Sequence, residues 1–154
     1  MSWLDSVRVV EPAAPTSIFF RDDDAGWDAN ALARLLARFA RADVPLDVAA
    51  IPAAVDDATV RVLEPHLADR GGLVRVHQHG FVHANHETVG RKCEYGPSRK
   101  ACEVAEEIER GAERLRMSGL DSIDPWFTPP WNRIQREHAE VLAALGFRAL
   151  SRDA

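Results

Sequence analysis

The chain has 154 residues and a formal net charge of −5, from 19 basic and 24 acidic side chains. Its composition, with 46% hydrophobic and 28% charged residues, is ordinary for a globular domain and excludes a disordered or low-complexity chain. The acidic balance argues against a nucleic-acid partner, and no apolar run reaches the roughly 18 residues that a membrane span needs. We therefore expect one domain over residues 17–154, preceded by an N-terminal lead-in over residues 1–16.

The lead-in has no apolar run of signal-peptide length and carries charged side chains, which favours a cytoplasmic location. Two cysteines, Cys93 and Cys102, are too few for a disulfide framework. They could pair with each other, but we expect two free thiols in a reducing compartment. Cys102 falls on the apolar stripe of a predicted helix, so we expect it in the core.

Short apolar runs alternate with amphipathic segments along the whole chain. Strands are predicted where β-branched, apolar or aromatic residues cluster, over 17–20, 46–51, 73–76, 126–128 and 147–150. Helices are predicted where apolar residues recur at spacings of three and four, from Asp28, from Asp56 or Asp57, over 98–119 and over 134–145. This alternation predicts an α/β fold with a mainly parallel sheet.

Three unusual clusters each follow a predicted strand. Residues 21–24 read Arg-Asp-Asp-Asp, residues 77–86 hold four histidines, and residues 129–131 read Pro-Pro-Trp. Because the carboxyl ends of parallel strands share one edge of the sheet, we expect the three clusters to meet there. Pro130 and Trp131 would then form a stiff wall beside a ligand, joined by Trp27, Phe81 and Tyr95.

The histidine cluster predicts a metal site. Imidazole is a common metal ligand, and His79 and His83 have the spacing H-x-x-x-H. Two ligands do not complete a site, so we expect Asp24 or a neighbouring carboxylate to add a third and leave one position open. Zinc is the expected metal, and the same donors suit iron, cobalt or nickel. The alternative is an α/β domain with a solvated, histidine-rich loop.

Taken together, the three clusters resemble the polysaccharide deacetylases, the NodB-homology group of carbohydrate esterase family 4. That family has an Asp-Asp pair after its first strand, an H-x-x-x-H motif after its third strand, and an Arg-x-Pro-aromatic stretch along the cleft. The resemblance implies that Asp23 is the catalytic base and that Asp24, His79 and His83 bind the metal; Asp22 and Asp23 are the alternative register. The other cleft residues that we single out are Arg21, Asp22, Trp27, Glu94, Tyr95, Arg99, Pro130 and Trp131.

Two of these residues have a specific expected task. Thr128 stands where the family has its cleft arginine, so Arg21 or Arg99 is expected to orient the base instead. Glu94 is expected to help arrange the long loop over residues 81–97.

The resemblance also implies a fold and an activity. The fold would be a distorted (β/α) barrel of which about five parallel strands are present. The activity would be metal-dependent hydrolysis of an N-acetyl group on an amino sugar, as a small molecule or polysaccharide, or on a related amide, with a divalent metal expected to be Zn²⁺. The family's later motifs, which include the histidine general acid, are missing, and His77, His86 and His138 are weak replacements. The alternative is therefore a metal- or carbohydrate-binding pseudoenzyme, and open strand edges predict a homo-oligomer.

Overall fold

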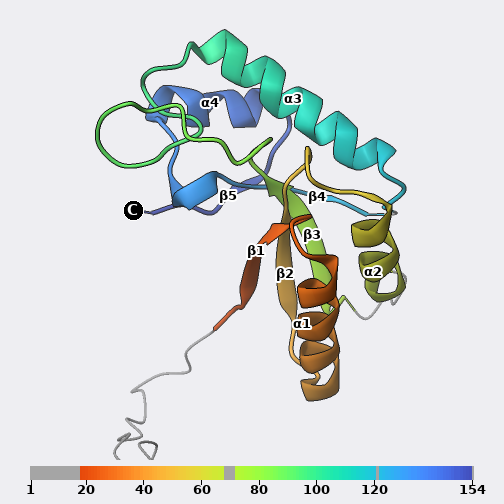
Figure 1. Ribbon diagram of the computed structural model, residues 1–154. Helices are drawn as coiled ribbons and strands as arrows, with labels where there is room; N and C mark the ends of the chain where they lie inside the picture. The colour runs from red at the N-terminus through yellow and green to blue at the C-terminus, as the bar shows by residue number, and fades with distance from the viewer. Residues whose placement is uncertain (1–17, 68–71, 121, 154) are drawn as a thin grey trace, which may run out of the picture.

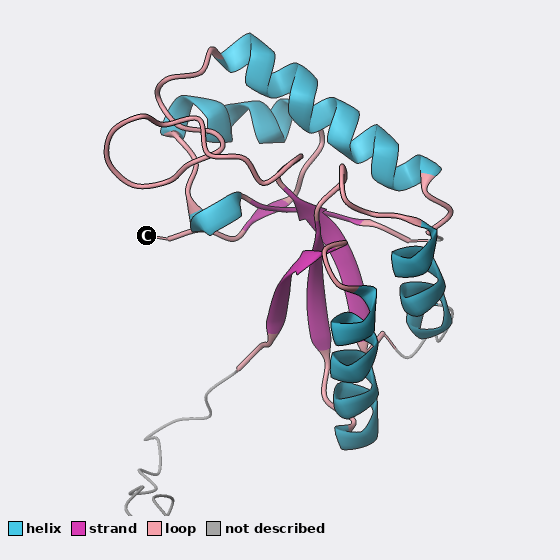
Figure 2. Cartoon of the chain, in the orientation of Figure 1, coloured by secondary structure: helices cyan, strands magenta, loops and turns pink. Residues whose placement is uncertain are grey.

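The computed structural model describes residues 18–67, 72–120 and 122–153, so the lead-in predicted over residues 1–16 lies outside the described residues (Figures 1 and 2). Five parallel strands form one sheet in the order β1-β2-β3-β4-β5. The strands are β1 (Arg21–Ala25), β2 (Leu46–Ala50), β3 (Val74–His79), β4 (Asp124–Thr128) and β5 (Ala149–Leu150). The helices are α1 (Ala29–Ala42), α2 (Asp57–Leu67), α3 (Ala101–Met117) and α4 (Arg136–Ala144), with a short 3-10 turn, η2 (Pro130–Asn132). The predicted α/β class and its five parallel strands are confirmed.

The helices pack in two pairs, and each pair covers one part of the sheet. Helices α1 and α2 lie side by side next to β1, β2 and β3, whereas α3 and α4 lie together at the other end of the molecule (Figure 1). The first pair buries a cluster that includes Leu36, Val48 and Leu63. The second buries a cluster around Phe127 and Ile108. Among the helices of the described ranges, none is long and apolar enough to cross a membrane.

Helix starts follow local chemistry closely. The Asp28 side chain accepts a hydrogen bond from the backbone N–H of Ala31 at 2.9 Å and caps α1, as predicted. At α2, the Asp56 carboxylate accepts from the backbone N–H and the hydroxyl of Thr59, each at 2.8 Å. This arrangement makes Asp56 the capping residue of α2 and resolves the choice between Asp56 and Asp57.

The first predicted strand was misplaced. The chain pairs with β2 through Arg21–Ala25, and the apolar residues before it are exposed, Ile18 by 76% and Phe19 by 70%. Within the described residues, β1 pairs only with β2, so its polar residues are not enclosed between two neighbouring strands. Strand β3 also extends further than predicted, to His79, because it continues to pair with β4 up to Thr128. Residues 21–24 therefore lie within β1, and His77 and His79 lie within β3, whereas His83 and His86 follow β3.

The buried face of α3 also differs from the prediction. Cys102 is exposed and Cys93 is buried, whereas both are free thiols as expected. The helix buries Val104, Ile108, Gly111 and Leu115. At Gly111 the helix comes so close to the sheet that an added Cβ would collide with the Gln78 side chain. Because glycine has no apolar side chain, Gly111 did not mark the buried face in the sequence, and the neighbouring stripe that includes Cys102 was predicted instead.

Candidate metal centre

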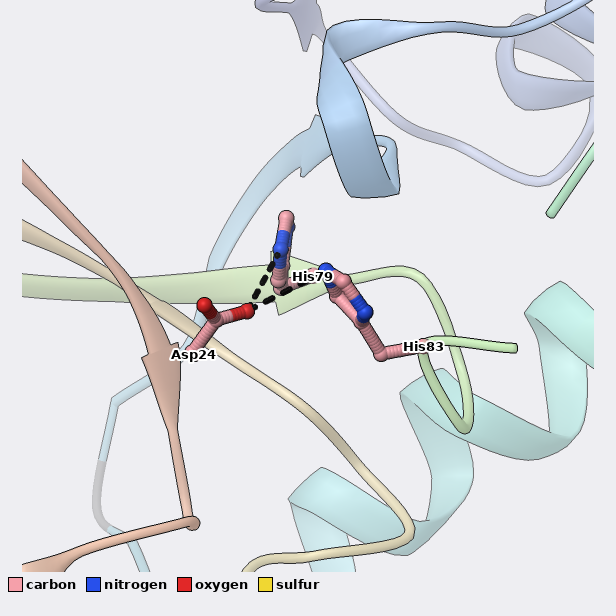
Figure 3. A group of neighbouring side chains, drawn as sticks. All are labelled: Asp24, His79 and His83. Carbon is pink, nitrogen blue, oxygen red and sulfur yellow. Dashed lines mark ion pairs between the residues drawn. The ribbon is translucent and has the colours of Figure 1, made fainter. Parts of the chain in front are cut away.

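Three side chains from two strand ends gather at one edge of the sheet (Figure 3). Oδ1 of Asp24 lies 3.3 Å from Nε2 of His79 and 3.2 Å from Nε2 of His83. Asp24 comes from the end of β1, His79 from the end of β3, and His83 from the loop that follows β3. One ligand atom from each residue lies within 4.8 Å of the others, and in the described part of the chain this is the one such group of histidine, cysteine or acidic side chains. The structure thus brings together the three residues for which the sequence predicted metal binding.

Two of these residues have left-handed backbones. The φ angle is 71° at Asp24 and 60° at His83, a region in which residues other than glycine are uncommon. At Asp24 this conformation interrupts the pairing between β1 and β2, where the register shifts between Asp22 and Ala25. The turn is closed by the backbone N–H of Trp27, which donates to the backbone carbonyl oxygen of Asp24 at 3.2 Å. Strained backbone of this kind is concentrated at functional sites.

The hydrogen bonds of His79 determine which nitrogen can bind a metal. Its Nδ1 lies 3.0 Å from the backbone oxygen of Thr128, which can only accept, so Nδ1 carries the proton. Burial favours the neutral ring and lowers the pKa of His79, although the Asp23 carboxylate opposes this shift. Nε2 therefore presents a lone pair toward Asp24.

The side-chain oxygen Oδ1 of Asp24 is also suited to bind a cation. This atom is buried and has no hydrogen-bond partner among the described residues. A buried carboxylate oxygen that faces an imidazole lone pair at 3.3 Å is unfavourable unless a cation lies between them. One carboxylate and two imidazoles are the donor set of many catalytic zinc sites. These residues therefore fit a divalent metal.

Next to Asp24, His79 and His83, Arg21 binds the Asp23 carboxylate through two nitrogens of its guanidinium. Arg21 Nε donates to Asp23 Oδ1 at 2.6 Å and Nη2 donates to Oδ2 at 2.9 Å. The same guanidinium donates to Asn132 Oδ1 at 2.6 Å and to the Ser151 hydroxyl. Arg21 thereby links β1 to η2 and to the residue that follows β5.

Comparison of the sequence with family models and with curated proteins gives no match. The fold does match solved structures. A chitin deacetylase from the fungal pathogen Colletotrichum lindemuthianum matches with a TM-score of 0.63 and 13% identity, over 86% of this chain and 54% of that chain. A family 4 carbohydrate esterase from Streptomyces lividans, in complex with acetate, matches with a TM-score of 0.59 and 13% identity, over 88% of this chain and 62% of that chain. The chain has the fold of the carbohydrate esterase family 4 deacetylases.

The deacetylase fold also occurs in proteins described as inactive. A family 4 pseudoenzyme from Bacillus anthracis matches with a TM-score of 0.59 and 14% identity, over 86% of this chain and 42% of that chain. The chain spans about half the length of the structures it matches, between 42% and 62% of them. The similarity that the motifs predicted is therefore present as a partial deacetylase barrel of five strands.

Within this deacetylase fold, the two arginines considered for the base have different partners. Arg21 contacts Asp23, whereas Arg99 forms two hydrogen bonds with Glu107 of α3, at 2.8 and 3.0 Å. Thr128 uses its hydroxyl to contact Nε2 of His77 at 2.9 Å. Asp22 is half buried, and burial, together with the charges of Asp23 and Asp24, raises its pKa.

Two of the predicted aromatic wall residues, Trp27 and Trp131, lie beside His83. The ring centroid of His83 is 4.8 Å from that of Trp27 and 4.4 Å from that of Trp131. Trp27 is 58% exposed, so it offers a free indole surface beside the site. Tyr95 does not line the cleft: it is fully buried and packs against Phe127 in the second core cluster. The prediction for Tyr95 was wrong because its residue type suits a core as well as a cleft wall.

Pro130 and Glu94 lie behind the site rather than in its lining. Pro130 is buried and packs against Gly80, where an added Cβ would collide with its ring. Glu94 is fully buried and accepts hydrogen bonds from the backbone of the loop that carries His83. Both residues support the shape of that loop.

The three histidines considered as general acids differ in their surroundings. Burial lowers the pKa of His77 to about 4, and the charge of Arg21 adds to this effect. His138 is buried, and its Nδ1 lies 2.9 Å from the backbone oxygen of Tyr95. His86 is exposed in the long loop.

Sequence reasoning missed Asn132 and Ser151, the two other partners of Arg21. Asn132 directly follows the Pro-Pro-Trp cluster but was not given a role, and Ser151 belongs to no recognisable motif. Ser151 directly follows β5, and the rule that chemistry gathers at the carboxyl ends of parallel strands could have indicated it.

Proposed function

We propose that this domain is a metal-dependent hydrolase that removes an N-acetyl group from an amino sugar or a related amide. One observation carries the proposal: Asp24 Oδ1, which has no hydrogen-bond partner among the described residues, faces the Nε2 atoms of His79 and His83 at 3.2–3.3 Å in a deacetylase fold. The names of the solved structures support the substrate class, since they include a chitin deacetylase and a carbohydrate esterase with acetate.

Zinc is the proposed metal, held by Asp24, His79 and His83 with one position open to substrate or water. A bound zinc ion would lower the pKa of a water molecule toward neutrality and polarise the acetyl carbonyl. His79 is ready to bind, because its proton is on Nδ1 and its hydrogen bond to Thr128 fixes the plane of the ring.

Asp23 is the proposed general base. Its side chain is 31% exposed, so a water molecule can reach it. The two hydrogen bonds from Arg21 fix the plane of its carboxylate. Asp23 accepts the proton of the water that attacks the acetyl carbon, a contribution that is typically about 10²–10⁴-fold in rate. Arg21 acts as the orienting arginine, in place of the one that Thr128 replaces.

Trp27 and Trp131 are the proposed sugar contacts. Both indoles contact the His83 ring, and Trp27 leaves more than half of its surface exposed. Indole rings supply the flat apolar surface on which the C–H face of a sugar ring packs. An acetylated amino sugar stacked there would have its acetyl group close to His83.

A second candidate is a pseudoenzyme that binds metal and carbohydrate without hydrolysis. The leaving amine needs a proton donor, and His77 is neutral at ordinary pH because its pKa is lowered to about 4. His138 is bound to the backbone oxygen of Tyr95 inside the core. The match to a Bacillus anthracis pseudoenzyme favours the same alternative.

Metal content and acetate release, measured on the same preparations, test the two candidates. We expect about one equivalent of zinc in the wild-type protein and in Asp23→Asn, and none in Asp24→Ala or His79→Ala. Acetate release from N-acetylglucosamine oligomers is expected for the wild type alone. Metal binding without acetate release would favour the pseudoenzyme, and the absence of metal after incubation with zinc would refute both.

A further inference from the structure

A fully buried carboxylate lies beneath the loop that carries His83. Oε1 of Glu94 accepts a hydrogen bond from the backbone N–H of Val82 at 2.9 Å and has a longer contact of 3.5 Å with that of Ala84. Its Oε2 accepts from the N–H of Phe81 at 3.3 Å. The carboxylate thus contacts the backbone on both sides of His83.

We propose that Glu94 is a positioning residue for His83, so that metal affinity depends on a carboxylate that does not bind the metal. The inference rests on the proposed function, because it takes Asp24, His79 and His83 as the metal ligands. It adds a residue from a different part of the chain to the machinery of that site.

The loop needs an internal support because its backbone is unfavourable by itself. His83 has a φ angle of 60° and Gly80 one of 57°, both in the left-handed region. A residue other than glycine keeps such a conformation only where its surroundings enforce it. The backbone N–H groups of the loop also need acceptors, and Glu94 supplies one to Phe81 and one to Val82.

The close approach of Glu94 leaves no room for a side chain at Gly80. A Cβ there would collide with the Glu94 carboxylate and with the ring of Pro130. The loop is therefore packed between the Glu94 carboxyl group and the ring of Pro130. This packing restricts the positions that the following residues, including His83, can occupy.

Glu94 has no cationic partner among the ion pairs of the described residues, which makes the hydrogen bonds to the loop its compensation. Burial raises the pKa of the Glu94 carboxyl, and the N–H groups of Val82 and Phe81 oppose this shift. A buried carboxylate is costly unless it is well hydrogen-bonded. Because Glu94 lies beneath the loop that carries His83, its burial is explained by the support that it gives to this loop.

The two histidine ligands depend on Glu94 to different degrees. His79 belongs to β3 and is oriented by the Thr128 oxygen, so the sheet holds it without help from the loop. His83 lies in the loop itself, and among the described residues its ring contacts the Asp24 carboxylate, His79 and the indoles of Trp27 and Trp131. Loss of Glu94 should therefore displace His83 Nε2 and leave His79 in place.

The test compares Glu94→Gln with Glu87→Gln. Glu87 lies in the same long loop and supports it elsewhere, since its Oε1 accepts from the backbone N–H of Ser98 at 3.1 Å and from its hydroxyl at 2.8 Å. Zinc affinity is measured by competition with a chelator, and the ligand geometry by the visible absorption of the Co²⁺-loaded protein. We expect Glu94→Gln to weaken zinc binding by about 10–100-fold and to change the cobalt spectrum, while Glu87→Gln alters neither. Wild-type affinity and spectrum in Glu94→Gln would overturn the inference.

A double-mutant cycle separates positioning from general destabilisation. If Glu94 acts through His83, adding Glu94→Gln to His83→Ala should not weaken zinc binding further. An additional loss in the double variant would contradict the inference. Glu94→Asp keeps the charge on a shorter arm and is expected to recover part of the affinity lost in Glu94→Gln; no recovery would also count against it. If the wild type itself binds no zinc, the proposed function fails, whereas an unaffected Glu94→Gln in a zinc-binding protein removes this inference alone.

Discussion

Nδ1 of His79 lies 3.0 Å from the backbone oxygen of Thr128. The contact joins β3 to β4 at the point where their pairing ends, since His79 and Thr128 are partners in the register of the two strands. It fixes the proton on Nδ1 and leaves Nε2 to face Asp24 at 3.3 Å. The orientation of the His79 ring is therefore determined by the pairing of β3 with β4.

The first prediction concerns which of the three adjacent aspartates binds the metal. Asp24→Asn removes the negative charge that faces both imidazoles, and we expect at least about a 100-fold loss of zinc affinity. Asp22→Asn is the matched control, because Asp22 has no ion pair with either histidine. Zinc competition titration measures both variants. In the alternative register Asp23 would bind the metal, so a loss of zinc affinity in Asp23→Asn larger than that in Asp24→Asn would show that register to be correct.

The second prediction concerns Arg21. Arg21→Ala removes the two hydrogen bonds that orient the Asp23 carboxylate. We expect acetate release to fall by about 10²-fold while zinc stoichiometry stays unchanged. Arg99→Ala is the control, since Arg99 pairs with Glu107 and has no contact with Asp23. Equal losses in both variants would show that the effect is general destabilisation.

The third prediction is a pH dependence of stability in the chelator-treated protein. Folded His77 has a pKa of about 4, below its ordinary value of 6.5, so the unfolded chain binds the proton more readily between these values. The free energy of unfolding should therefore fall as pH drops from 6.5 to 4, by an amount on the order of 3 kcal/mol.

His77→Gln should remove most of this dependence. Its amide can still reach Thr128, which His77 contacts at 2.9 Å, but the amide does not titrate. His86→Gln, at an exposed position, should keep the wild-type slope. Urea unfolding at several pH values measures all three proteins, and a slope in His77→Gln as steep as in the wild type would contradict the assignment.

The fourth prediction concerns self-association. Ile18 and Phe19 are 76% and 70% exposed and lead directly into β1, an edge strand of the described sheet. Exposed apolar edges promote pairing between chains, so we expect concentration-dependent oligomers in light scattering. Phe19→Lys should reduce them, whereas Val89→Lys, at an 86% exposed loop position, should not. A wild-type protein that stays monomeric at all concentrations would refute this expectation.

The sequence predicted best where the cause is local. Asp28 caps α1, and the stripe that includes Leu32 and Leu36 is buried, because both features depend only on neighbours along the helix. It failed where the cause is distant. Phe19 looked like a buried strand residue, yet its burial depends on what lies beyond the edge of the sheet. Cys102 was misplaced because Gly111 sets the closest approach of α3 to the sheet.

The residues of the candidate metal centre were predictable from the sequence, whereas the residues that support them were not. Asp24, His79 and His83 carry recognisable spacing, and their strand ends meet as the parallel sheet requires. The hydrogen bonds of Glu94 to residues 81 and 82 and those of Arg21 to residues 132 and 151 join parts of the chain that no motif connects. Such contacts follow from the fold as a whole.

Asp22 contributes to the site as a spacer. Side chains two residues apart on a strand share a side, and this parity places Arg21 next to Asp23 with Asp22 between them. Deleting Asp22 would leave two consecutive aspartates in the sequence, and a motif comparison would still accept them. It would also turn Arg21 to the opposite side of β1 and separate the guanidinium from the carboxylate that it holds. Asp22, the additional aspartate that made the motif register ambiguous in the sequence, thus keeps Arg21 and Asp23 on the same side of β1.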